Sequence, residues 1–219
     1  MRIRHLSQHS YALLALLALL FSSCHNDYTP KPYAYLRIDL PEHDYWLVDT
    51  LFHAGDTLTN TDTLVAVALE DKTFPFTFEA NECIEWTEKD APKGERWIDL
   101  KYPQWDGVVF LTYKQLKNNE ELRGQIDTSS RYLEQHYSFA TGIEEQGYED
   151  KENKVYGTVY YLKGSKVAST CQFWLTDSTN HFLRGALYLN TTPNNDSLAP
   201  VIDYIQADIE HLVETLRWR

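Results

Sequence analysis

The chain has few cysteines and lacks the short motifs that mark common enzyme sites. Only 3 cysteines occur among 219 residues, and no two of them stand in the CxxC spacing typical of zinc sites and thiol exchange. The sequence also contains no GxSxG nucleophile elbow, no HExxH metal pair, no phosphate-binding glycine loop and no GxGxxG turn. These absences argue against the common hydrolase, zinc-enzyme and nucleotide-binding classes. We therefore expect no enzymatic activity, no cofactor and no metal site.

Basic residues are also scarce. The chain has 20 Lys and Arg against 32 Asp and Glu, and no Lys/Arg cluster offsets this balance. An acidic protein surface repels the phosphates of nucleic acids and anionic headgroups. We therefore expect no nucleic-acid partner.

Aromatic residues, by contrast, are abundant. The 15 Tyr, 9 Phe and 6 Trp suit a protein that contains a β-sheet, and they exclude a disordered chain. The length lies within the range of one domain and suffices to bury a core.

The N-terminal segment is typical of an export signal. Arg2 and Arg4 precede the apolar run YALLALLALLF at 11–21, which is shorter than the roughly 20 residues needed to span a bilayer. The following FSSC resembles a bacterial lipobox, whose cysteine is diacylated on sulfur and becomes the new N-terminus. Each buried CH2 contributes about 0.8 kcal/mol, so two or more acyl chains anchor a protein stably. We therefore expect a signal peptide at 1–23 and lipidation of Cys24; the alternative is a plain secretory signal with a chance cysteine.

A polar segment follows the expected lipidation site. Residues 25–32 (HNDYTPKP) include Pro30 and Pro32, which favour an extended chain. This pattern predicts a lipidated tether at 24–32 and a single domain at 33–219. Removal of the signal peptide leaves 18 basic and 32 acidic residues, a formal charge of −14.

Alternating apolar and polar residues predict most of the strands, and short connections between the later ones favour antiparallel pairing. We expect 49–72 to form a loop with a short strand inside it, and the charged stretch 143–154 to form a turn. The predicted strands lie at 33–40, 74–78, 83–87, 97–102, 108–113, 155–162, 167–175 and 182–189.

Two segments have the period of an amphipathic helix. One spans about 119–137, with a narrow apolar stripe that ends at Leu133 and Tyr137. The other begins after a predicted N-cap at Asp196 or Ser197, with Pro200 in its first turn. Its apolar stripe is broad, and its acidic residues are predicted to face away from the core: Asp203, Asp208, Glu210 and Glu214. Together these patterns predict an α+β fold, an antiparallel sheet with a central helix and a long C-terminal amphipathic helix packed on it.

Few residues outside the N-terminus suggest a site. Asp177, His181 and Arg184 flank one predicted loop, where they could bind a partner or line a shallow site; simple turn chemistry is the alternative. Asp208 and His211 are expected to form a surface pair. The other two cysteines, Cys83 and Cys171, lie in apolar-alternating contexts that favour free thiols, with a disulfide left open.

The last third of the chain carries a distinctive block, TDSTNHFLRGALY at 176–188, followed by PNNDSLAP at 193–200 and Arg217-Trp218. The front end contributes YTPKP at 28–32 and YAYLRIDLP at 33–41. On these residues the chain resembles the gliding motility lipoprotein GldD family of the Bacteroidetes over nearly the whole mature length. The stretch 49–72 is longer than the family pattern needs. The arrangement also resembles the αβα sandwich of Mog1 and PsbP.

The resemblance implies a lipoprotein of the cell envelope, anchored in the outer membrane and facing the periplasm. It implies a non-enzymatic accessory role in gliding motility and type IX secretion, through contacts with other proteins of that machinery. The family supplies no catalytic residues and no cofactor, so only Cys24 carries over, as the acylation site. The alternative is an envelope ligand-binding or hydrolytic protein with a site near Asp177, His181 and Arg184.

Overall fold

The computed structural model describes residues 38–48 and 74–219, which belong to one compact unit, Arg37–Arg219. The predicted signal peptide, Cys24, the tether and the loop at 49–72 lie outside the described residues. Of the strand predicted at 33–40, only residues 38–40 are described. The described residues form ten strands in antiparallel sheets, two α-helices and a 3-10 turn, Pro103–Trp105. The predicted α+β fold is therefore confirmed.

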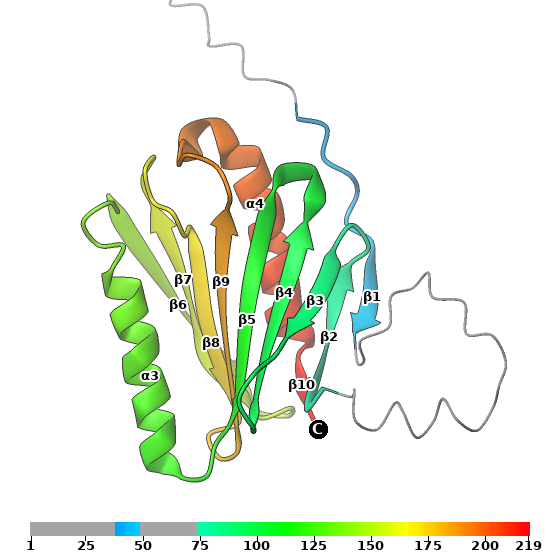
Figure 1. The fold of residues 1–219 in the computed structure, drawn as a ribbon, viewed down its shortest axis with the longest axis vertical. Coiled ribbons are helices and arrows are strands. Elements are labelled where there is room, and N and C mark those ends of the chain that lie inside the picture. The colour runs from blue at the N-terminus through cyan, green and yellow to red at the C-terminus, as the bar shows by residue number, and fades with distance from the viewer. Residues whose placement is uncertain (1–37, 49–73) are drawn as a thin grey trace, which may run out of the picture. The chain divides into compact units, whose positions relative to one another are not determined.

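A seven-stranded sheet forms the centre of this unit, with strand order β3-β4-β5-β9-β8-β7-β6 (Figure 1). Every neighbouring pair is antiparallel. The three last strands follow one another through short connections, as their sequence pattern predicted. The seven strands are β3 (Glu85–Lys89), β4 (Glu95–Tyr102), β5 (Gly107–Gln115), β6 (Gly142–Asp150), β7 (Val155–Lys163), β8 (Cys171–Thr176) and β9 (His181–Leu189).

A smaller sheet joins the two ends of the described chain. Its middle strand, β2 (Phe76–Asn81), pairs on one side with β1 (Tyr45–Val48) and on the other with β10 (Arg217–Trp218). Phe76 and Phe78 of β2 are fully buried in the main core. The small sheet therefore fixes both the early segment and the C-terminus to the body.

The two helices lie on opposite faces of the large sheet. Helix α4 (Asn195–Thr215) packs with Val159 and Tyr161 of β7 in the main core cluster. Helix α3 (Asn119–Glu134) contributes Leu133 to a separate small cluster with Leu162 and Val167. Because neighbouring residues of a strand point to opposite faces, Tyr161 and Leu162 place the helices on different sides. The result is a helix–sheet–helix arrangement, with α4 behind the strands in Figure 1.

Close contact between strands and side chains requires glycine at particular places. A Cβ on Gly185 would lie 2.1 Å from a ring carbon of Phe173, which is fully buried on the neighbouring strand β8. The absence of a side chain at Gly185 therefore allows the Phe173 ring to lie flat against β9.

Several elements differ from their sequence predictions. The stretch 143–154 is largely strand β6 and not a turn; it lies at the sheet edge, with most side chains in solvent, so it lacks an apolar alternation. Residues 167–170 precede β8 instead of extending it. Residues 38–40 are not in a strand, and the first described strand is β1.

Both helix predictions also need corrections at their ends. Helix α4 begins at Asn195 after the N-cap Asn194, whose side chain makes no capping hydrogen bond, so Asp196 and Ser197 lie inside the first turn. Pro200 consequently lies inside the helix beyond the first turn. Helix α3 ends at Glu134, and Tyr137 is 51% exposed beyond it.

Within residues 38–48 and 74–219, neither helix combines the length and the apolar character that a membrane span requires. Cys83 and Cys171 are free thiols, and Cys171 is fully buried.

Candidate functional site

Asp177 lies in the turn between β8 and β9 and stabilises that turn. Its Oδ1 accepts backbone hydrogen bonds from Thr179, Asn180 and His181 at 2.8–2.9 Å, and its Oδ2 accepts one from the Thr179 hydroxyl. Burial acts to raise the pKa of this carboxyl, but the hydrogen bonds outweigh it and lower the pKa. The geometry of Asp177 therefore matches the alternative interpretation, in which its carboxylate stabilises the turn through local hydrogen bonds.

His181 and Arg184 point to opposite faces of β9, because they stand an odd number of residues apart. The His181 Nδ1 lies 2.8 Å from the Tyr113 hydroxyl, and its ring stacks on Trp218. On the other face, the Arg184 guanidinium lies 4.6 Å from the ring centre of Tyr132 on α3. Asp177, His181 and Arg184 thus do not line one cleft, and their predicted partner-binding role stays a prediction.

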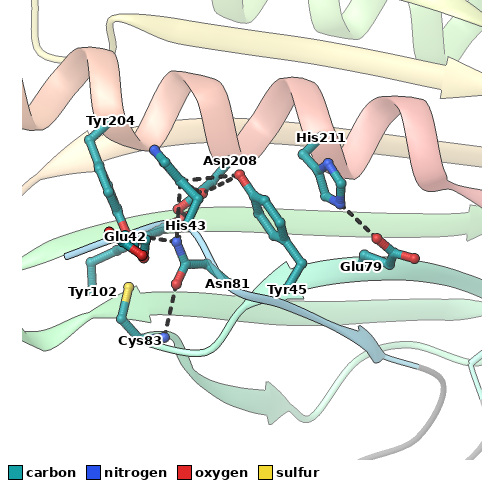
Figure 2. Close-up of polar contacts among 10 residues, drawn as sticks. All are labelled: Glu42, His43, Tyr45, Glu79, Asn81, Cys83, Tyr102, Tyr204, Asp208 and His211. Carbon is teal, nitrogen blue, oxygen red and sulfur yellow. Dashed lines mark hydrogen bonds and ion pairs between the residues drawn. The ribbon is translucent and has the colours of Figure 1, made fainter.

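A more connected group of polar side chains surrounds Asp208 of α4 (Figure 2). The Asp208 side chain is only 2% exposed. Its Oδ1 accepts hydrogen bonds from the Tyr45 hydroxyl at 3.0 Å and from the Asn81 amide at 3.1 Å, and lies 2.7 Å from the His43 Nδ1. Its Oδ2 accepts one from the Tyr102 hydroxyl at 3.0 Å. One buried carboxylate therefore joins β1, β2, β4 and the segment before β1 to α4.

Further contacts extend this group, which we call the Asp208 cluster. The Asn81 amide also donates to the Tyr204 hydroxyl at 2.7 Å, and its Oδ1 accepts the backbone N–H of Cys83. The His43 ring stacks on Tyr204 with centroids 4.0 Å apart. The early segment and the helix are thereby held by ring stacking as well as by hydrogen bonds. The cluster comprises His43, Tyr45, Asn81, Tyr102, Tyr204 and Asp208.

A second histidine pairs beside the cluster. The Tyr45 ring stacks on His211 at 3.7 Å, and the His211 Nε2 lies 2.7 Å from Glu79 Oε2 on β2. The expected surface pair of Asp208 and His211 is therefore wrong. Asp208 is buried, and His211 pairs with Glu79 instead.

Burial and charge keep the tyrosine hydroxyls of the cluster, and the thiol of the neighbouring Cys83, protonated. Burial, and then the negative charge of Asp208, raise the pKa of the Tyr45 and Tyr102 hydroxyls. Burial chiefly raises the pKa of Tyr204 to about 12. Burial, and then the negative charge of Asp208, also raise the pKa of the Cys83 thiol. Because the thiolate is the nucleophilic form, this thiol is not activated for attack.

The arrangement of side chains in the Asp208 cluster suits a structural role better than a catalytic one. A His–Asp pair can orient a general base, but an activated nucleophile must lie beside it. The nearby Cys83 has a raised pKa, and the tyrosine hydroxyls donate to the carboxylate. In the part of the chain that the structure describes, no three His, Cys, Asp or Glu side chains are placed to hold a metal ion. The Asp208 cluster therefore acts as a latch that holds residues 43–45 against α4.

Sequence reasoning missed this cluster, although one signal for it exists. Asp208 stands three residues after Ile205 and four before Leu212, so it lies within the apolar stripe of α4. An acid at such a position is buried and needs hydrogen-bond donors. Its donors come from strands far away in the sequence, and no local pattern marks them.

Comparison with known proteins identifies the family. No curated protein matches the chain. The family model described as gliding motility lipoprotein GldD matches residues 65–218, which include both helices and every described strand except β1. The match covers well over half of the sequence, so the chain belongs to the gliding motility lipoprotein GldD family.

Proposed function

We propose that this gliding motility lipoprotein is a non-enzymatic accessory component of the gliding and type IX secretion machinery. It acts through contacts with other proteins of that machinery, anchored by acyl chains on Cys24 in the outer membrane and facing the periplasm. The observation that carries the proposal is the family match over residues 65–218, together with the lipobox that ends at Cys24.

The anchor explains how weak contacts can suffice. Acyl chains confine a protein to a membrane plane and raise its effective concentration near other anchored subunits. The Asp208 cluster fixes the chain at His43, so only the segment between Cys24 and His43 separates anchor and body. Even a fully extended segment of this length spans at most roughly 65 Å. The body therefore works within a limited layer above the membrane.

The geometry of the described residues supports a role without catalysis. Burial raises the pKa of both Cys83 and Cys171, which makes each a poor nucleophile. Asp177 caps the turn before β9, and His181 and Arg184 point to opposite faces of that strand. The rival hypothesis of a hydrolytic or ligand-binding site at these three residues gains no support from their placement.

Replacement of the acylated cysteine tests the anchor. We expect Cys24→Ala to release a folded chain from the membrane fraction and to abolish gliding and type IX secretion. The control joins the same variant to an unrelated membrane anchor, which should restore both activities because it restores confinement. Normal motility and secretion by Cys24→Ala at normal expression would contradict the proposal.

Contacts with the machinery are tested separately. The intact lipoprotein is crosslinked in its native envelope, and the attached subunits are identified by mass spectrometry. We expect components of the gliding or secretion apparatus to be enriched over those captured by an unrelated lipoprotein. Equal recovery of such components by both lipoproteins would count against a role through direct contacts.

A further inference from the structure

A cleft of about 260 Å³ lies between the end of β7 and the first half of α4. Tyr161 and Lys163 line it from the strand side, and Asp196, Asp203 and Gln206 line it from the helix. The cleft belongs to neither the Asp208 cluster nor the turn at Asp177. It is open to solvent.

The helix presents only negative charge to this cleft and its surroundings. Helix α4 contains no Lys or Arg. Its exposed acids Asp196, Asp203 and Glu210 follow one another at seven-residue steps, and Glu214 comes four residues later, so all four share one face. Glu210 accepts a hydrogen bond from the Tyr161 hydroxyl at 2.6 Å, which places this face beside β7. Among the described residues, Asp196, Asp203 and Glu214 have no ion-pair partner.

Strand β6 forms one edge of the sheet beside β7, the strand that meets this acidic face through the hydrogen bond from Tyr161 to Glu210. It is paired with β7 and, within the described residues, with no strand on its other side. Its register with β7 places Glu144 opposite Tyr161 and Gln146 opposite Val159, so these side chains point to the α4 side. Strand β6 thus continues the surface of the sheet beyond β7, on the side of the sheet where α4 carries its acidic row.

The free backbone groups of β6 can be assigned from the neighbouring ladder. The Leu162 N–H bonds to Thr170 on the β8 side, so even-numbered residues of β7 bond to β8 and odd-numbered ones to β6. Their partners on β6 are even-numbered. The odd-numbered residues of β6 therefore direct N–H and C=O groups outward, among them Glu145 and Gly147.

The charges on this edge select the kind of strand that can join it. Proteins commonly block an exposed edge with lysine or proline, and β6 contains neither. It carries Glu144, Glu145, Glu149 and Asp150, so a second copy of the same edge is repelled. Lys163 pairs with Glu144 near one end, and Arg217 lies 3.9 Å from Asp150 near the other. Lys163 also lines the cleft with Asp203, but its ammonium is paired with Glu144; among the described residues neither Asp203 nor Glu210 has an ion-pair partner.

We propose that β6 and the acidic face of α4 form a docking site for an extended segment of a partner protein that carries Lys or Arg at alternate positions. The segment adds to β6 as a further strand, and its basic side chains face Asp203 and Glu210. Main-chain hydrogen bonds supply affinity in this mode of recognition, and alternate side chains supply specificity. The inference rests on the proposed function, because it names the chemistry of one protein contact.

A synthetic peptide of about ten alternating lysines and valines serves as the probe, a length typical of strands. Binding to the full-length acylated chain in detergent is measured by fluorescence anisotropy. Gly147 allows a matched pair of variants, because a Cβ there meets nothing within 4 Å. We expect Gly147→Pro, which removes an outward N–H, to weaken binding about tenfold, whereas Gly147→Ala stays within about twofold. Equal binding by the two variants would overturn strand addition.

A second matched pair of variants tests the contribution of the acidic side chains to binding. The double variant Asp203→Asn with Glu210→Gln should weaken binding about fivefold and reduce its dependence on salt. The control removes the same charges from exposed sites on α3, by Glu120→Gln with Asp127→Asn, and should leave binding unchanged. Equal losses in both double variants, or equal binding of a glutamate–valine peptide, would refute the acidic groove. If circular dichroism shows that Gly147→Pro does not fold, the binding measurements on these two double variants decide whether the proposal stands.

In cells the two proposals fail separately. If Gly147→Pro abolishes gliding while Gly147→Ala does not, with both chains acylated and at normal abundance, the docking site is supported. If Gly147→Pro is fully active but Cys24→Ala is not, the docking site is wrong and the anchored role stands. If Cys24→Ala is fully active, the anchored role fails whatever the peptide does.

Discussion

The two helices of this protein are both amphipathic, yet they are held in place by different forces. Helix α4 buries eight of its 21 residues, whereas α3 buries two of its 16, Ser129 and Leu133. Helix α3 has local support instead: the Asn118 side chain accepts from the Glu121 N–H, and the Glu121 carboxylate accepts from the Lys117 N–H. Helix α4 has no side-chain N-cap. A broad apolar stripe allows packing to hold a helix, and a narrow one leaves more to its ends.

Truncation in the two stripes tests this contrast most strongly. Ile205 of α4 is fully buried, so we expect Ile205→Ala to lower the free energy of unfolding by about 4 kcal/mol. Ile126 of α3 is only partly buried, and Ile126→Ala should cost less than about 1.5 kcal/mol. Urea unfolding of the mature chain measures both. Equal losses would show that α3 is as firmly packed as α4.

The polar member of the α4 stripe gives the next largest effect. Asp208→Ala leaves the Tyr45 and Tyr102 hydroxyls and the Asn81 amide without their buried acceptor, and we expect a loss of about 3 kcal/mol. Asp208→Asn keeps one acceptor oxygen and should lose less. Limited proteolysis should show faster cleavage near residues 43–48 in Asp208→Ala than in Ile205→Ala at matched stability. Unchanged protection there would contradict the latch.

Variants at the helix caps should have smaller effects, and here the loss should be larger in α3 than in α4. Asn118→Ala removes the capping oxygen of α3 and should cost about 1 kcal/mol. Asn194→Ala, at the corresponding position of α4, removes no capping hydrogen bond and should cost under about 0.5 kcal/mol. Thermal unfolding of the two variants compares them directly. A larger loss at Asn194 would mean that the start of α4 depends on its local ends after all.

The smallest effect concerns two histidines outside the Asp208 cluster. Burial lowers the pKa of His136, which follows α3, and of His181 on β9; the charge of Arg184 adds to the effect at His136, and that of Asp177 opposes it at His181. The unfolded state then binds more protons, so this contribution is complete above the unfolded pKa of about 6.5 and is lost as pH falls through the lower folded values. We expect stability to decrease between about pH 7 and pH 5.

The control for this pH effect removes both titrating groups. The double variant His136→Gln with His181→Gln should show a flatter dependence of unfolding free energy on pH over the same window. Denaturant unfolding at several pH values provides the comparison. An unchanged slope in the double variant would assign the pH dependence to other groups.

Prediction from sequence succeeded where burial leaves a periodic signal and failed where it does not. The strands at 155–162 and 182–189 and the stripe of α4 were found, because each buries one face against the core. Strand β6 was missed because its sequence, GIEEQGYED, has acidic and glycine residues on both faces; pairing with β7 alone makes it a strand. The cap of α4 was misplaced because packing, rather than a side-chain oxygen, begins that helix.

The sequence alone determined the class of the fold and the resemblance to the family, and it predicted an export signal and acylation at Cys24, because these depend on residues close together in the chain. Tertiary structure decided where the polar groups go. Asp208 meets Tyr45, Asn81 and Tyr102 across long stretches of sequence (Figure 2), and Glu210 of the acidic row of α4 meets Tyr161 of β7, the neighbour of β6. A buried carboxylate needs donors, and these donors become neighbours only when the strands and the helix have packed.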